Sequence, residues 1–361
     1  MKGEKIKSKL LKWIKLFFFI YLFILSIELI KKASMILAPN IKDFLLQNLT
    51  PLKAIATGWF VTSIVQSSGA VSSVVATFAG HNLISLTTAV YIMVGASLGT
   101  IITALIISLA TTAQRRKDFR HGFEIALSYA IYSALLVIIV LILEYFFKFF
   151  SRISLFLAEI IGPKLSSLNA PNFVEILTSP IINFLFKFDY KLILLLLGFV
   201  ILILTLKYLG NSIIEILGGE DKAKNFINKY FDSKYKAYFI GVVLTAIVFS
   251  SSITIGLLVP IAVARIISLR QAIPFILGAD LGTFTDLFIA AIIIDQPLAL
   301  ATAIAYMLFG VIGAIVFLPN VEILRKMTKF VSKRLIEISR KKALYILIGF
   351  IVIPLLIILL F

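Results

Sequence analysis

The residues best suited to binding an ion are small polar side chains set inside apolar segments. The stretch IVQSSGAVSS (64–73) places one Gln and four Ser within an apolar run from 54 to 80. A second apolar run, 238–264, contains three consecutive Ser residues at 250–252. Hydroxyl and amide groups can donate to an oxyanion, and their oxygens can coordinate Na⁺. We therefore expect ion binding at these positions.

A polar stretch at membrane depth must be buried in protein or line a water-filled cavity. An interrupted helix leaves N–H groups that attract anions and carbonyl groups that attract cations. Two facing interruptions could therefore hold an anion together with cations. The alternative is structural, because Ser and Gly also allow helices to pack closely.

Two carboxylates lie inside the apolar run FILGADLGTFTDLFIAAIII (275–294). A charge at that depth costs about 2.5–3.5 kcal/mol on insertion scales and usually marks function. Asp280 and Asp286, beside Thr283 and Thr285, would ligate Na⁺ or accept a proton. Alternatively, Asp286 pairs with a Lys or Arg across the bundle. The predicted cation-binding residues are Ser72, Thr100, Thr103, Asp280, Thr283 and Asp286.

Composition sets the class of protein. The chain has 361 residues, is 60% hydrophobic and has a mean hydropathy of +1.06, which is too apolar for an ordinary soluble domain. It contains no Cys and two His, so thiolate and His metal sites are not expected. The net charge of +17 fits basic cytoplasmic loops better than nucleic-acid binding. No ATP-binding or nucleophile motif is present, and we expect neither an enzyme nor a cofactor.

The chain repeats itself at an offset of 183 residues. TSIVQSS (62–68) aligns with TAIVFSS (245–251), and GASLGT (95–100) aligns with GADLGT (278–283). No gap is needed between 57–110, the first copy, and 240–293, the second copy. Internal repeats of this kind are typical of secondary transporters.

The expected fold is an all-α polytopic membrane protein with two inverted-topology repeats. Each repeat contains a broken, re-entrant hairpin (54–80 and 238–264), followed by a helix with the Gly-Ala-x-Leu-Gly-Thr motif (83–110 and 268–294). We predict the first repeat at 1–150, an external connection at 151–188, the second repeat at 189–320, and a basic surface helix with a last crossing at 321–361. The seven predicted full crossings are 12–30, 83–110, 122–147, 190–210, 268–294, 298–319 and 343–361.

Charge gives the expected orientation. With the N-terminus inside, the four inner segments carry 23 of the 35 Lys and Arg residues, and the outer segments carry nine. This obeys the positive-inside rule and leaves three crossings per repeat, so the second copy is inverted. We expect a multi-pass protein of a bacterial or archaeal plasma membrane with a cytoplasmic N-terminus. Three carboxylates near helix ends, Glu124, Glu144 and Glu215, are expected at the interface.

The paired motifs resemble the type II sodium-dependent phosphate cotransporter family. That family carries Gln-Ser-Ser-Ser in each of two inverted repeats, followed by Gly-Ala-Asn-x-Gly-Thr-Thr-type segments. The resemblance implies Na⁺-coupled import of inorganic phosphate. It also implies that substrate binding is carried by Gln66, Ser67, Ser68, Ser250, Ser251 and Ser252.

The chain departs from the family pattern at five positions. Gly69 replaces the third Ser of the first motif, and Phe249 replaces the Gln of the second. Ser97 and Asp280 replace the usual Asn, and Asp286 stands where the first copy has Thr103.

Three functions follow from these observations. The first is Na⁺-coupled phosphate import through the bilayer, with no nucleic-acid partner and an oligomeric state that the sequence leaves open. The second is transport of another small anion, or H⁺ coupling through Asp280 or Asp286. The third belongs to another class, a passive anion channel.

Overall fold

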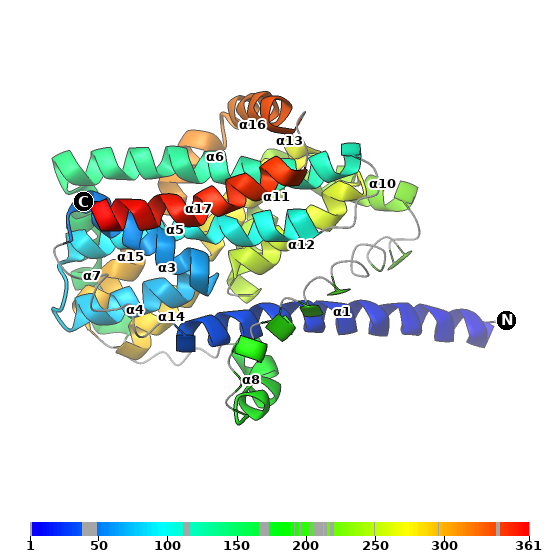
Figure 1. Ribbon diagram of the computed structural model, residues 1–361, viewed down its shortest axis with the longest axis horizontal. Helices are drawn as coiled ribbons and strands as arrows, with labels where there is room; N and C mark the ends of the chain where they lie inside the picture. The colour runs from blue at the N-terminus through cyan, green and yellow to red at the C-terminus, as the bar shows by residue number, and fades with distance from the viewer. Residues whose placement is uncertain are drawn as a thin grey trace.

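The structure is a computed structural model. It describes residues 2–37, 49–110, 116–165, 173–188, 220–248, 250–294, 296–336 and 340–360, and only part of the chain between 189 and 219. Every regular element in these ranges is a helix (Figure 1). Four described helices are long and apolar enough to cross a membrane: Leu86–Ala110, Phe119–Phe147, Leu269–Ile292 and Pro297–Phe317.

The first copy and its surroundings are built by six helices. They are α1 (Lys2–Leu37), α3 (Pro51–Val65), α4 (Ser68–Gly80), α5 (Leu86–Ala110), α6 (Arg116–Phe147) and α7 (Phe149–Leu165). The remaining helices are α8 (Phe173–Leu185), α10 (Glu220–Phe231), α11 (Lys234–Val248), α12 (Ser251–Val263), α13 (Leu269–Gly282), α14 (Phe284–Ile294), α15 (Pro297–Phe317), α16 (Val321–Ile336) and α17 (Arg340–Leu360).

The expected crossings have different outcomes. Those at 83–110, 122–147 and 298–319 coincide with α5, α6 and α15. The crossing at 190–210 falls largely outside the described residues. The crossing at 268–294 is not one uninterrupted helix, because α13 ends at Gly282 and α14 begins at Phe284.

The connection between α13 and α14 is a short local unwinding. The Thr283 N–H is shared among the carbonyls of Ala279, Asp280 and Leu281, and the Asp286 N–H donates to the Thr283 carbonyl at 3.3 Å. The interruption therefore lies between the two intramembrane carboxylates and directs them differently.

Glycine allows the same close helix contact in both copies. A Cβ at Gly95 on α5 would overlap the Ile55 carbonyl of α3, and a Cβ at Gly278 on α13 would overlap the Tyr238 carbonyl of α11. These two contacts are related by the 183-residue offset. In the absence of a side chain the backbones approach closely, as small residues permit in membrane proteins. The α3–α5 and α11–α13 pairs are the most extensive helix contacts in the described structure.

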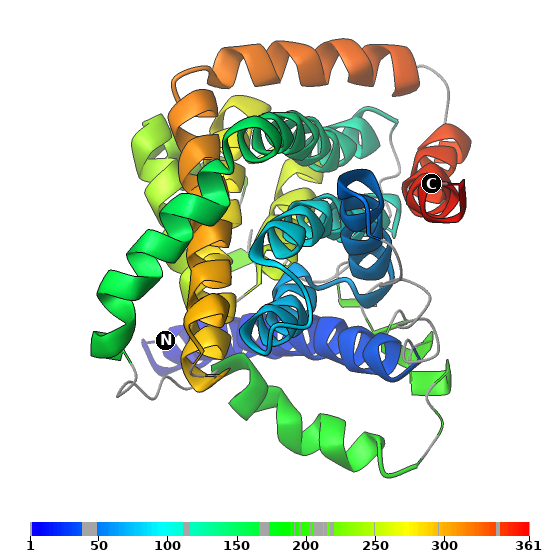
Figure 2. The ribbon, with the colours of Figure 1, turned by 90° about the vertical axis from the view of Figure 1, so that its left-hand side faces the viewer.

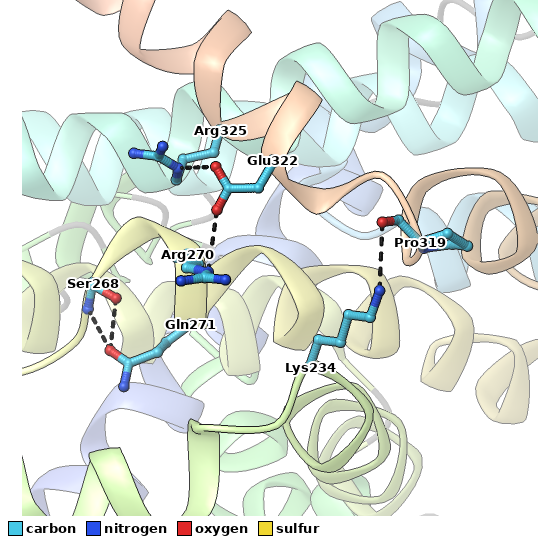
Figure 3. A network of polar contacts seen from close by, with 7 residues as sticks. All are labelled: Lys234, Ser268, Arg270, Gln271, Pro319, Glu322 and Arg325. Carbon is cyan, nitrogen blue, oxygen red and sulfur yellow. Dashed lines mark hydrogen bonds and ion pairs between the residues drawn. The ribbon is translucent and has the colours of Figure 1, made fainter.

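The basic helix α16 lies across one side of the bundle, as Figure 2 shows. Glu322 on α16 accepts from Arg325 at 2.7 Å and from Arg270 on α13 at 3.1 Å (Figure 3). The Lys234 ammonium donates to the Pro319 carbonyl at 3.4 Å. The start of α16 is therefore held to α11 and α13 by polar contacts.

Two carboxylates expected at the interface are instead buried in protein. Glu144 is fully buried and accepts from the backbone N–H groups of Phe150 and Ser151 at 3.0 and 3.2 Å. Glu124 is 5% exposed and accepts from Arg120 and from Ser332 of α16, each at 2.9 Å. Both carboxylates thus join helix ends within the bundle.

The third, Glu215, is exposed and pairs with Lys12 and Lys15. This matches the expectation for an interfacial side chain.

Candidate functional site

The first helix interruption lies at Gln66 and Ser67. Helix α3 ends at Val65, and Gln66 adopts a left-handed conformation with φ 58°. Ser67 is extended and caps α4, with its hydroxyl accepting from the Ala70 N–H at 3.2 Å. Ser is a favoured N-cap residue because its oxygen satisfies an N–H of the first turn. The sequence thus ends one helix and starts another inside an apolar run.

The second interruption repeats this geometry 183 residues later. Ser250 is extended and caps α12, with its hydroxyl accepting from the Ile253 N–H at 3.3 Å. Helix α11 ends at Val248. Phe249, which takes the place of the Gln, lies outside the described residues. The two N-caps therefore perform the same local role in the two copies.

The structure brings the two interruptions together. The Ser252 hydroxyl donates to the Gln66 carbonyl at 3.4 Å. Gln66, Ser68, Ser251 and Ser252 are all buried. The buried polar groups of the predicted substrate set thus share one region although they come from opposite halves of the chain.

Tyrosines from two flanking helices reach the same region. Tyr306 of α15 donates to the Ser68 hydroxyl at 3.3 Å and also interacts with Ser97. Tyr129 of α6 interacts with the Ser251 side chain. Each copy therefore presents its second break Ser to a buried phenol.

Asp280 is buried and held by two of these phenols. Tyr132 donates to its Oδ2 at 2.8 Å, and Tyr129 donates to its Oδ1 at 3.4 Å. Among the residues that the structure describes, no Lys or Arg pairs with Asp280. Gly313 makes room for the Tyr132 ring, since a Cβ there would overlap the hydroxyl.

The predicted cation-binding residues fall into three groups. Ser72 and Thr103 are fully buried, and their hydroxyls have no hydrogen-bond partner in the described part of the chain. Thr100 and Thr283 donate to carbonyls of their own helices, Ala96 at 3.1 Å and Ala279 at 3.0 Å.

The two Asp residues form the third group. Asp280 is bound by tyrosines, and Asp286 lies against Gly69 at the start of α4. No direct hydrogen bond joins Ser72, Thr100, Thr103, Asp280 and Thr283 to one another in the described residues.

Sequence reasoning missed Tyr129, Tyr132 and Tyr306. A signal was present, because Tyr129 and Tyr132 follow two Ser-containing turns of an otherwise apolar helix, ALSYAIYSALL (126–136). Buried Tyr hydroxyls usually find a hydrogen-bond partner. Polar side chains on an apolar helix were therefore a reason to expect contact with the breaks.

Comparison with known families gives one match. The model of the Na⁺/Pi-cotransporter family matches residues 22–162 and 201–333, which together make up more than half of the chain. Both matched segments contain one interruption and one Gly-Ala-x-Leu-Gly-Thr motif.

Several curated proteins are similar to this chain. Sodium-dependent phosphate transport protein 2A of Rattus norvegicus is 22% identical over 98% of this chain and 68% of its own length. Sodium-dependent phosphate transport protein 2B of Homo sapiens is 26% identical over 48% of this chain and 26% of its own. The uncharacterized protein YqeW of Bacillus subtilis is 41% identical over 24% of this chain and 28% of its own.

No solved structure matches the chain. The family match nevertheless spans the whole candidate site, from the first interruption to the tyrosine helix α15. The chain therefore belongs to the Na⁺/Pi-cotransporter family, and it is an integral membrane transporter and not an enzyme.

Proposed function

We propose that this chain is a secondary active transporter that imports inorganic phosphate together with Na⁺. The observation that carries the proposal is the contact between the two interruptions, where Ser252 donates to the Gln66 carbonyl. Two helix starts capped by Ser, with buried hydroxyls beside them, form a polar region inside an apolar bundle. Such a region suits an oxyanion and its cations.

The anion is assigned to the six residues of the breaks. The N–H groups at the starts of α4 and α12 attract negative charge. Hydroxyls of Ser68 and Ser251 stand beside them, each in contact with a tyrosine. The full set is Gln66, Ser67, Ser68, Ser250, Ser251 and Ser252.

The cations are assigned to the carboxylates and to the buried hydroxyls. A fully buried hydroxyl without a partner is costly and calls for an explanation. Ser72 and Thr103 are in this condition, and their oxygens are of the kind that Na⁺ prefers. Asp280 and Asp286 would supply negative charge to balance the cations. Na⁺ serves as the coupling ion in this proposal, and no other cofactor is invoked.

We further propose that the two copies are inverted relative to one another and that alternating access arises by motion around the interruptions. The conserved 183-residue offset of the caps and of the glycine contacts supports two equivalent units. The distribution of Lys and Arg supports a cytoplasmic N-terminus in a plasma membrane. The re-entrant hairpins belong to this proposal as well.

Radiolabelled phosphate uptake into proteoliposomes tests the proposal. An inward Na⁺ gradient should drive saturable uptake, and a K⁺ gradient of equal size should not. Gln66→Ala and Ser251→Ala should abolish that uptake. The matched control is Ser154→Ala, a fully buried Ser on α7, which should transport normally.

Other outcomes would select the rival functions. Uptake driven by a pH gradient alone would indicate H⁺ coupling. Flux that is ungated by any gradient and does not saturate would indicate an anion channel. No phosphate uptake, with uptake of another anion by the same vesicles, would change the substrate.

A further inference from the structure

The Asp286 carboxylate occupies a space that exists only because residue 69 is Gly. A Cβ at position 69 would overlap Oδ2 of Asp286 and would lie 2.9 Å from its carboxyl carbon and 3.3 Å from its Cβ. Any other residue at 69 would push the carboxylate out of this position. Gly69 and Asp286 therefore form a matched pair across α4 and α14.

This carboxylate lies beside the proposed anion site. Gly69 directly follows Ser68, whose hydroxyl accepts from Tyr306. The charge of Asp286 also acts on the Tyr306 hydroxyl. A negative charge has thus been placed next to the Ser that the proposed function assigns to an anion.

A buried hydroxyl lies within one turn of the same pair. Ser72 follows Gly69 by three residues, so both point to the same side of α4. Its hydroxyl is fully buried and has no hydrogen-bond partner in the described residues. An unpartnered oxygen beside a carboxylate is a suitable arrangement for a cation.

The equivalent place in the second copy carries no charge. The 183-residue offset relates Gly69 to Ser252 and Asp286 to Thr103. The negative charge is therefore specific to the first interruption, where α14 contacts α4.

We propose that Asp286 makes anion binding depend on a bound cation. This inference rests on the proposed function and assigns its coupling to one residue. Without a cation, the carboxylate repels an oxyanion at Ser68, and this repulsion is strong where water is scarce. A cation held by Asp286 and Ser72 removes the repulsion, so the cation binds first and the anion follows.

The test compares phosphate uptake in Na⁺ and in K⁺ for the full-length protein in proteoliposomes. In Asp286→Asn, which keeps the shape and removes the charge, the ratio of the two initial rates should fall about tenfold, because uptake in K⁺ rises. Asp232→Asn is the control, since it removes an equal charge from an exposed bend and should leave the ratio unchanged.

A second pair of variants tests the geometry. Gly69→Ser should displace the carboxylate and lower the ratio as Asp286→Asn does. Gly69→Ser combined with Asp286→Thr relieves the overlap while keeping the site neutral. This double variant should fold normally and retain the low ratio.

A third measurement does not depend on transport. The melting temperature of the purified wild type should rise with Na⁺ concentration in the absence of phosphate, and this rise should be lost in Asp286→Asn. If the wild type shows Na⁺-driven uptake but Asp286→Asn has the same ratio and the same Na⁺ stabilisation, Asp286 has no coupling role. Folded Asp286→Asn that loses uptake in both media equally would also overturn the inference. A wild type that responds to neither Na⁺ nor phosphate would overturn the proposed function, and the inference with it.

Discussion

The two copies keep the same backbone features and differ in their polar side chains. Both have a Ser N-cap at the interruption, at Ser67 and Ser250, and both have a glycine-mediated contact between paired helices. The motif helices differ, since the first copy has Ser97 and Thr103 where the second has Asp280 and Asp286. The features that fix helix position are thus shared, whereas the features that carry charge are not.

The copies also differ in how their hydroxyls are satisfied. In the second copy, Thr245 and Thr254 hydrogen-bond to each other at 2.8 Å. In the first copy the equivalent of Thr245 is Thr62, which is fully buried and has no partner among the described residues. The first copy therefore retains hydroxyl oxygens that the second copy has used internally.

The largest effect is expected where the copies are alike. Gly95→Ala and Gly278→Ala each place a Cβ onto a backbone carbonyl, and overpacking costs about 1–3 kcal/mol when the neighbours can shift. Because a backbone atom cannot rotate away, we expect low yields of folded protein from both variants by size-exclusion chromatography.

Gly349→Ala on α17 is the control for these variants. Its Cβ would meet only the Ile353 side chain, at 3.8 Å, so yield should be normal. A normal yield from one glycine variant and not from the other would break the equivalence of the two helix pairs.

The next effect is expected where the copies differ in charge. Asp280→Asn should reduce Na⁺-driven uptake about ten- to hundredfold, the range given by loss of hydrogen bonds to a charged group. Ser97→Ala, the equivalent site in the first copy, should have a much smaller effect on the initial rate. Equal losses from the two variants would contradict a special role for the second copy's carboxylate.

Smaller effects are expected at the tyrosines. Tyr306→Phe should raise the phosphate KM about fivefold, because one neutral hydrogen bond contributes about 1 kcal/mol. Tyr129→Phe should do more, since it touches both Asp280 and Ser251. Tyr345→Phe, an exposed tyrosine on α17, should leave KM unchanged.

The smallest effect is expected on the surface helix α16, away from both copies' interruptions. Hydrogen bonding to Arg325, together with the charges of Arg325 and Arg270, lowers the pKa of Glu322. Its ion pairs should therefore hold α16 above the usual carboxyl pKa and weaken as the pH falls through the lowered value. Glu322→Gln should increase hydrogen exchange in α16 about two- to threefold at neutral pH, and this difference should vanish in acid.

Local features of this fold were predictable from sequence. Ser caps act within three residues, so the interruptions at Gln66 and at Ser250 follow from the sequence around them. Gly282 likewise marks the unwinding that separates α13 from α14. The basic periodic segment after residue 320 forms α16 as expected.

Features that depend on distant packing were not predictable. Tyr129 and Tyr306 serve equivalent Ser residues but are separated by 177 residues and not by 183, so the gapless alignment did not pair them. The contact of Gly69 with Asp286 joins two helices far apart in the chain. Glu144 was placed at the interface because its sequence position does not show the N–H groups that it accepts. The inverted orientation and the bound ions stay predictions, since helix bounds alone do not give them.

The left-handed backbone of Gln66 has a consequence for how this protein can be improved. Helices often end in this conformation, where Gly is preferred because it has no Cβ, and residues other than Gly carry strain there. Gln66→Gly should therefore give a hardier protein, yet it would delete the amide that faces the second interruption. A search for heat-tolerant variants would select the substitution that silences the transporter, so thermostability alone is the wrong criterion at this position.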